Sequence, residues 1–168
     1  NAAYNLYGFR QNYHPALKNH NLHINSSYNI TLVNTVRDLG VLLDSSLNLK
    51  AHITSVTRSC FFHLRRIRQV KKCLNERCLR VLVQALVISR IDYCNSILAG
   101  LPAVTIHPLT TVLHAAARII KDIPHRDHIT PAMRNLHWLP ILARVTFKLC
   151  SLMYNIFSHR APTYICPH

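Results

Sequence analysis

The sequence contains only three glycines and six acidic residues in 168. So few glycines count against an all-β fold with many tight turns and against a glycine-rich phosphate-binding loop. The carboxylates include no adjacent Asp-Asp pair, so two-metal phosphoryl chemistry has no ligands here. We expect no catalytic residues, no metal site and no cofactor in this chain. The length fits one domain, or one domain with a small appendage, and 49% hydrophobic residues suffice for a sizeable core.

Signs of secretion or membrane insertion are also missing. The six cysteines are spread over a chain too long to need disulfides, and no basic, apolar leader opens the sequence. The longest charge-free apolar stretch of note, residues 81–89, is far shorter than the roughly 20 residues that span a bilayer. We therefore expect an intracellular protein, cytoplasmic or nuclear, that is not secreted and has no membrane partner. Because position 1 is Asn rather than Met, we expect a piece of a longer protein.

Short alternating segments are typical of the first 47 residues. Segments 22–25 and 28–33 flank an Asn-Ser-Ser sequence, which predicts a hairpin. Within segment 36–44, Gly40 marks either a β-bulge or a close approach to another backbone. We assign residues 1–47 to this β region and residues 48–168 to a helical region.

From Asn48 onward, apolar residues recur at intervals of three and four, as in α-helices. Helices are expected from about residue 48, capped by Asp44, Ser45 or Ser46, and over 75–98, 108–121, a short stretch after Thr130-Pro131, and 140–158. The expected inward-facing residues are Ile53, Val56, Cys60, Leu64 and Ile67, then Leu79, Leu82, Val83, Leu86, Tyr93, Ile97 and Leu98, then Leu109, Val112, Leu113, Ala116, Ile119 and Ile120, and finally Leu142, Val145, Leu149, Leu152, Met153 and Ile156. The fold class is α+β, mostly α, with a short N-terminal β-hairpin or strands followed by four to five packed helices.

The formal net charge of +14 is concentrated in one segment. Residues 48–80 carry nine cations and a single acid, Glu76. On a helix, Arg58, Arg65 and Lys72 share a face opposite the apolar stripe, and Phe61 and Phe62 lie among them. Cations track a phosphate backbone and exposed aromatic rings stack on bases or sugars, so this face predicts binding to nucleic acid. The alternative is a solvated helix face.

Weaker patterns suggest other sites. A zinc ligand set can be drawn from two cysteines and two histidines, Cys73, Cys78, His125 and His128, although their spacing is loose. A nucleophile–base pair of Cys94 with His114 or His137 lacks any supporting signature. The sole tryptophan, Trp138, is interpreted as a buried anchor between helices, and Asp92 as the ion-pair partner of Arg90.

Seven segments, taken together and in this order, resemble one known family. They are Val36-Arg37-Asp38-Leu39-Gly40-Val41-Leu42-Leu43-Asp44, Ser89-Arg90-Ile91-Asp92-Tyr93-Cys94-Asn95 leading to Leu98-Ala99-Gly100-Leu101-Pro102, Ala115-Ala116-Ala117-Arg118, Asp127-His128-Ile129-Thr130-Pro131, Leu136-His137-Trp138-Leu139-Pro140, Phe147-Lys148 and Ala161-Pro162-Thr163-Tyr164-Ile165. The chain resembles the C-terminal part of the reverse transcriptase of LINE-type, non-LTR retrotransposons. The similarity covers Val36 to the end and extends more faintly from Asn1, where the family's lysine before Gly8 is missing.

The resemblance implies that residues 1–47 are a palm remnant with a primer-grip hairpin and that residues 48–168 are a helical thumb and C-terminal helical region. Leu39, Gly40 and Val41 would form the primer grip, and the helices that follow would clamp a template–primer duplex. The expected nucleic-acid-binding residues are cations and one aromatic, namely Arg58, Arg65, Arg66, Lys72 and Phe62. The partners would be RNA, DNA or an RNA–DNA hybrid, bound through phosphates, and the upstream palm of the parent polymerase.

The resemblance also implies what the chain does not do. The family's catalytic Asp-Asp turn and the Mg²⁺ ions that it holds belong to the palm, so this chain would be a truncated polymerase without catalysis of its own. The alternatives are a vestigial or protein-interaction helical module without a nucleic-acid role, and a zinc-stabilised module.

Overall fold

The computed structural model describes residues 22–25, 28–30, 33–162 and 164–165. The backbone divides the chain into two units, Asn1–His52 and Ile53–His168, which are described separately. The weak similarity at residues 1–8 and position 163 of the last motif lie outside the described residues. The architecture confirms the expected α+β, mostly α class, with short antiparallel strands followed by about five helices.

The first unit contains two antiparallel strand pairs. Strands β1 (Leu22–Asn25) and β2 (Tyr28–Ile30) pair as the expected hairpin, with an irregularity between His23 and Asn25. Strands β3 (Thr35–Asp38) and β4 (Val41–Asp44) pair in regular register from Thr35–Asp44 to Asp38–Val41. The bulge considered at Gly40 is therefore wrong. Leu39 and Gly40 are the two-residue turn, and both have positive φ, 43° and 83°. Two positive φ values suit the twist of a tight hairpin, and glycine adopts them without strain.

The Asp44 carboxylate organises the turn between β4 and helix α1 (Lys50–Val70). Its oxygens accept hydrogen bonds from the backbone N–H groups of Ser46, Asn48 and Leu49, at 3.1, 3.0 and 2.8 Å. Burial raises the pKa of Asp44, but the hydrogen bonds from Ser46, Asn48 and Leu49 outweigh it, so the net pKa lies below its usual value. The expected cap at Asp44, Ser45 or Ser46 is wrong: Asp44 binds the backbone before the helix, and the N–H of Lys50, the first residue of α1, donates to the side-chain oxygen of Asn48 at 2.8 Å.

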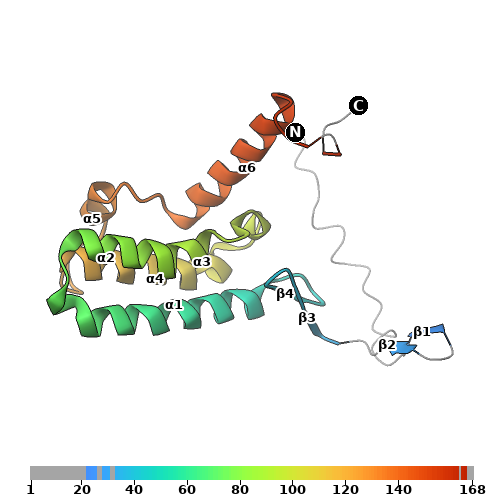
Figure 1. Cartoon of the computed structure of the whole chain (residues 1–168), viewed down its shortest axis with the longest axis horizontal. Helices are drawn as coiled ribbons and strands as arrows, with labels where there is room; N and C mark the ends of the chain where they lie inside the picture. The colour runs from blue at the N-terminus through green and yellow to red at the C-terminus, as the bar shows by residue number, and fades with distance from the viewer. Residues whose placement is uncertain (1–21, 26–27, 31–32, 163, 166–168) are drawn as a thin grey trace. The chain divides into compact units, whose positions relative to one another are not determined.

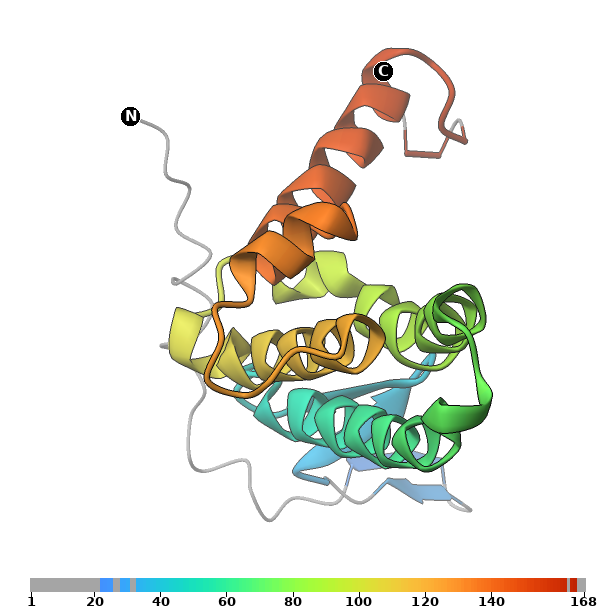
Figure 2. The ribbon, with the colours of Figure 1, turned by 90° about the vertical axis from the view of Figure 1, so that its left-hand side faces the viewer.

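The second unit is helical, and α1 runs into it from the first. After α1 come α2 (Glu76–Val83), α3 (Ser89–Asp92), α4 (Ala103–Lys121), α5 (Thr130–Asn135) and α6 (Ile141–Phe157). The α1 helix, the α2–α3 segment and α4 lie side by side, and α6 leads away from them (Figures 1 and 2). The most completely buried large side chains come from these three layers: Cys60, Val83, Val87, Ile88, Val112 and Leu113.

The single helix expected over 75–98 is interrupted in the structure. A π-helical segment, η4 (Gln84–Ile88), separates α2 from α3, and the helix ends at Asp92. Cys94 then adopts a left-handed conformation with φ 51°, before the 3₁₀ turn η5 (Asn95–Leu98). Of the residues expected inside, two that follow this break, Tyr93 and Ile97, are exposed, Leu82 and Leu86 are half-buried, and the rest are buried: Leu79, Val83 and Leu98. A π segment adds a residue to one turn and so rotates the following side chains around the axis.

Helix α4 begins five residues before the expected start at Pro108. Its first turn follows Pro102, whose carbonyl accepts the N–H groups of Thr105 and Ile106, and Pro108 lies within the helix. All six residues predicted to face inward on this helix are buried. Among the described residues, α4 is the only helix with the length and composition of a membrane span. Core helices with a buried apolar stripe pass the same test, and α4 has such a stripe.

The C-terminal helices confirm one expectation and correct two. Helix α5 begins at Thr130-Pro131, as predicted. The inward-facing set predicted for the last helix is largely wrong, because only Val145 of that set is buried. Asp92 forms its ion pair with Arg144 of α6, at 2.8 Å, and not with Arg90. Trp138, in the link between α5 and α6, is half-buried.

Candidate nucleic-acid interface

Helix α1 presents Arg58 and Arg65 on the side opposite its buried stripe. Ile53, Cys60, Leu64 and Ile67 are buried, and the predicted Val56 is half-buried. Arg58 and Arg65 are exposed and seven positions apart, which places them on one face about 10.5 Å apart along the axis. The spacing of residues along α1 thus determines that its apolar side chains pack into the core while Arg58 and Arg65 lie on the exposed face.

Phe62 lies between these two arginines on the same exposed face. Its side chain is 57% exposed, although a phenylalanine of this size ordinarily gains by burial. The guanidinium carbon of Arg66 lies 6.0 Å from the centre of the Phe62 ring, and the His63 ring meets it edge-on at 5.5 Å. A cation held over an aromatic face leaves the guanidinium N–H groups available to phosphate oxygens.

Helix α1 ends before Lys72, so the expected continuous face of Arg58, Arg65 and Lys72 is divided. The helix stops at Val70, and Lys72 lies in the 3₁₀ turn η3 (Lys71–Cys73), where it is exposed. Lys72 therefore follows the α1 cations along the chain without being held in their helical register.

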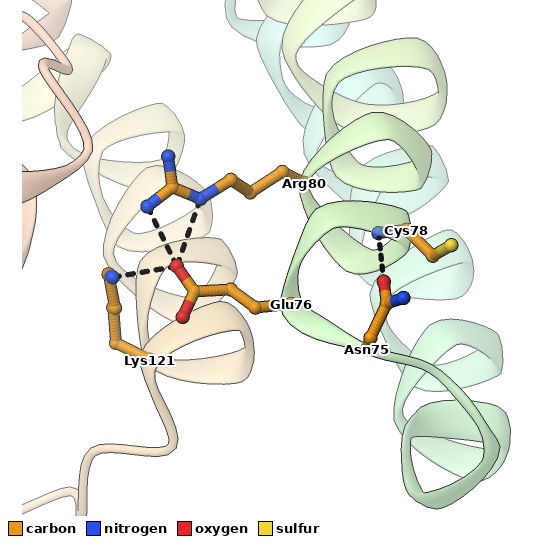
Figure 3. A network of polar contacts seen from close by, with 5 residues as sticks. All are labelled: Asn75, Glu76, Cys78, Arg80 and Lys121. Carbon is orange, nitrogen blue, oxygen red and sulfur yellow. Dashed lines mark hydrogen bonds and ion pairs between the residues drawn. The ribbon is translucent and has the colours of Figure 1, made fainter.

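Ion pairs remove some cations of this segment from the interface. Lys71 forms an ion pair with Asp122, just beyond the end of α4. The Glu76 carboxylate accepts from Arg80 and from Lys121 of α4, at 2.7 Å each (Figure 3). The hydrogen bond from Lys121 has the larger effect on the pKa of Glu76 and that from Arg80 the next, and together they hold this pKa below its usual value. Asn75 caps the same turn by accepting the Cys78 N–H at 2.8 Å.

The remaining cations of residues 48–80 have no carboxylate within ion-pair distance in the described part of the chain. They are Lys50, Arg58, Arg65, Arg66, Arg68, Lys72 and Arg77. Helix α1 itself contains no acidic residue. Arg68 and Arg77 are also exposed and belong to the nine cations counted in this segment, but they are not among the five candidate binding residues predicted from sequence. We call the exposed set Arg58, Phe62, Arg65, Arg66 and Lys72 the α1 basic surface.

Of the two histidines on α1, His63 lies beside Phe62, and it adds no positive charge near neutral pH. Burial, followed by the neighbouring Arg90, lowers the pKa of His63. The charge of the α1 basic surface therefore comes from lysine and arginine alone, and it persists across the physiological pH range.

The proposed primer-grip residues lie at the tip of the β3–β4 hairpin. Leu39 and Gly40 form the turn and are exposed, whereas Val41 opens β4 and is buried. Gly40 therefore has a purely local reason to be glycine, namely its φ of 83°. A close approach to another backbone stays a prediction.

The alternative metal site is not assembled. In the part of the chain that the structure describes, no three His, Cys, Asp or Glu side chains come together as a metal site requires. Cys73, Cys78, His125 and His128 are each exposed at the surface. This result contradicts the zinc hypothesis for these four residues.

Comparisons with known proteins identify no relative. No protein-family model matches the chain, and no curated protein or solved structure does so either.

Proposed function

We propose that this chain is the primer-grip and thumb region of a LINE-type, non-LTR retrotransposon reverse transcriptase and that it binds template–primer through phosphate contacts. The observation that carries the proposal is the run of seven motifs from Val36 to Ile165, in the family's order. Any one of these segments is common by chance, whereas seven in order are specific.

The charge distribution supports this proposal independently of the motifs. Arg58, Arg65 and Arg66 project from a helix without a single acid, and Phe62 is exposed among them. A structural helix face ordinarily mixes both signs of charge, which gives local pairs at intervals of three and four. The α1 basic surface lacks that compensation and is suited to a polyanion.

The same proposal assigns no polymerisation to this chain alone. Nucleotidyl transfer needs carboxylates that hold two metal ions, and the sequence has no adjacent acidic pair. RNA, DNA or an RNA–DNA hybrid would be its ligand, and the palm of the parent enzyme would supply the Mg²⁺ site. Binding would occur inside the cell, in the cytoplasm or nucleus.

Binding to duplexes of unrelated sequence tests the proposal. We expect similar affinities for several RNA–DNA hybrids of about 20 base pairs, because phosphate contacts carry no sequence information. Charge reversal at Arg58, Arg65 and Lys72 together should weaken all of them equally. Loss of affinity for one sequence only would instead indicate base readout. No binding to any duplex would favour a protein-interaction or vestigial module.

A further inference from the structure

Helix α6 carries an apolar stripe that the helical unit leaves largely exposed. Leu142, Val145, Leu149, Leu152 and Ile156 are spaced by three, four, three and four residues. Val145 and the neighbouring Ile141 are buried, and α6 contacts η5 and α4. Leu149 and Leu152, on the same side but further along, are 37% and 43% exposed. The stripe thus begins in the core and continues beyond it.

The position of α6 explains this exposure. The helix leaves the other helices of its unit and its later turns extend away from them (Figure 2). Arg144 fixes its first turn, because its guanidinium bonds the Asp92 carboxylate at 2.8 Å and the Leu139 carbonyl at 2.9 Å. No such polar contact anchors residues 149–157 to α1–α5 in the described part of the chain.

The three-four spacing identifies the geometry of the missing contact. Side chains at these intervals form a seam that packs against one other helix at a shallow angle. The seam covers nearly the whole length of α6, about 25 Å. A seam of two heptads is short, and the charged residues beside such a seam set the choice of partner and its orientation.

The cations beside the apolar stripe of α6 determine which kind of helix can pack against it. Lys148 flanks the stripe, and residues 128–168 contain no acidic residue. Arg144 is paired with Asp92, whereas the other three cations of this range have no carboxylate within ion-pair distance in the described residues: Arg134, Lys148 and Arg160. A second copy of the chain would bring a further formal charge of +14 to the contact. An acidic partner would instead be drawn to it, because opposite charges beside an apolar seam favour pairing.

We propose that the α6 stripe, defined as Leu142, Leu149, Leu152, Met153 and Ile156, binds an amphipathic α-helix of another protein whose apolar face is bordered by acidic residues. This surface is separate from the α1 basic surface. The inference does not depend on nucleic-acid binding.

The test uses the full chain and two designed helical peptides. Both peptides carry leucine at heptad positions a and d; one has glutamate and the other lysine at positions e and g. Binding is measured by fluorescence anisotropy of the labelled peptides. We expect the glutamate peptide to bind at least about tenfold more tightly than the lysine peptide, with the difference shrinking as salt rises.

Two variants locate the binding site. The double variant Leu149→Asp with Leu152→Asp should weaken binding of the glutamate peptide at least about tenfold. The control Phe147→Asp introduces the same kind of change at a 67% exposed position on the opposite side of α6 and should leave binding unchanged. All three positions are exposed, so circular dichroism should report the same helix content for each protein.

Four results would overturn the proposal. Equal binding of the two peptides would show that charge does not select the partner, and no binding of either would show that the stripe does not accept a helix. A dimer in light scattering that Leu149→Asp with Leu152→Asp converts to monomer would assign the stripe to a second copy. Stripe-dependent binding to phosphatidylserine vesicles, without peptide binding, would assign it to a membrane.

Discussion

Neutralising three cations of the α1 basic surface should change the salt dependence of nucleic-acid binding by a calculable amount. The variant is Arg58→Gln, Arg65→Gln and Lys72→Gln. All three side chains are exposed and lie outside ion-pair distance of any carboxylate in the described residues. Their loss should therefore remove phosphate contacts without breaking an ion pair of the fold.

The magnitude follows from counterion release. Each phosphate contact contributes about −0.9 to the slope of log affinity against log salt concentration, so three contacts contribute about −2.7. Between roughly 50 and 200 mM salt, wild type should lose about 40-fold more affinity than the variant. Fluorescence anisotropy with a labelled RNA–DNA hybrid of about 20 base pairs measures both slopes.

A matched control separates a local surface from overall charge. The variant Arg126→Gln, Arg134→Gln and Lys148→Gln removes the same three charges from exposed positions outside α1. We expect this control to keep a slope within about one unit of wild type. Equal slopes for the two triple variants would refute the reasoning, because net charge and not the α1 basic surface would then govern binding.

Three further predictions concern the fold. Gly40→Ala places a Cβ atom on a residue with a φ of 83°, which should destabilise the β3–β4 hairpin by about 1–2 kcal/mol. The backbone amides of β3 and β4 should then exchange hydrogen about tenfold faster, and unchanged exchange rates would contradict the turn geometry. Burial raises the pKa of the Cys60 thiol to about 11, so iodoacetamide at pH 8 should modify exposed Cys78 while Cys60 stays unmodified, as peptide mass spectrometry would show. Burial, then Arg118 and His107, lower the pKa of His114, so its unfolded form binds protons more readily. The Tm of the wild type should stay constant above about pH 6.5 and decrease below that pH, and His114→Gln should make this decrease smaller. The same pH dependence of the Tm in wild type and variant would contradict the prediction.

Sequence periodicity predicted the core helix well because its pattern and its environment agree. On α4, every predicted inward residue is buried, from Leu109 to Ile120. The same reasoning failed for α6, where Leu149 and Leu152 have the right spacing but no covering layer among α1–α5. Periodicity shows which side of a helix is apolar, but it does not show what packs against that side.

Backbone irregularities were the other feature of the fold that the sequence did not predict. Residues 75–98 contain no glycine or proline to mark a break, yet the helix contains the π segment at 84–88 and ends at Asp92. Packing of Val87 and Ile88 into the core accompanies this change of period, and tertiary packing is not visible in local sequence. Pro108 led to a predicted helix start that is too late, because α4 already begins after Pro102 and contains Pro108 within it.

The cations of the candidate site were more predictable than their register. Arg58 and Arg65 lie on the exposed face, as a seven-residue spacing requires. Lys72 left that register because α1 ends at Val70, and Lys71 turns toward Asp122, a residue 51 positions away in the chain. Contacts at such separation depend on the folded arrangement.

The salt dependence of binding by the unaltered chain tests the central claim most directly. Four cations on the α1 basic surface, Arg58, Arg65, Arg66 and Lys72, predict a slope of about −3.6 for log affinity against log salt concentration with an RNA–DNA hybrid. A slope flatter than about −1 over the same range would contradict the account, because these cations would then make no more than one phosphate contact.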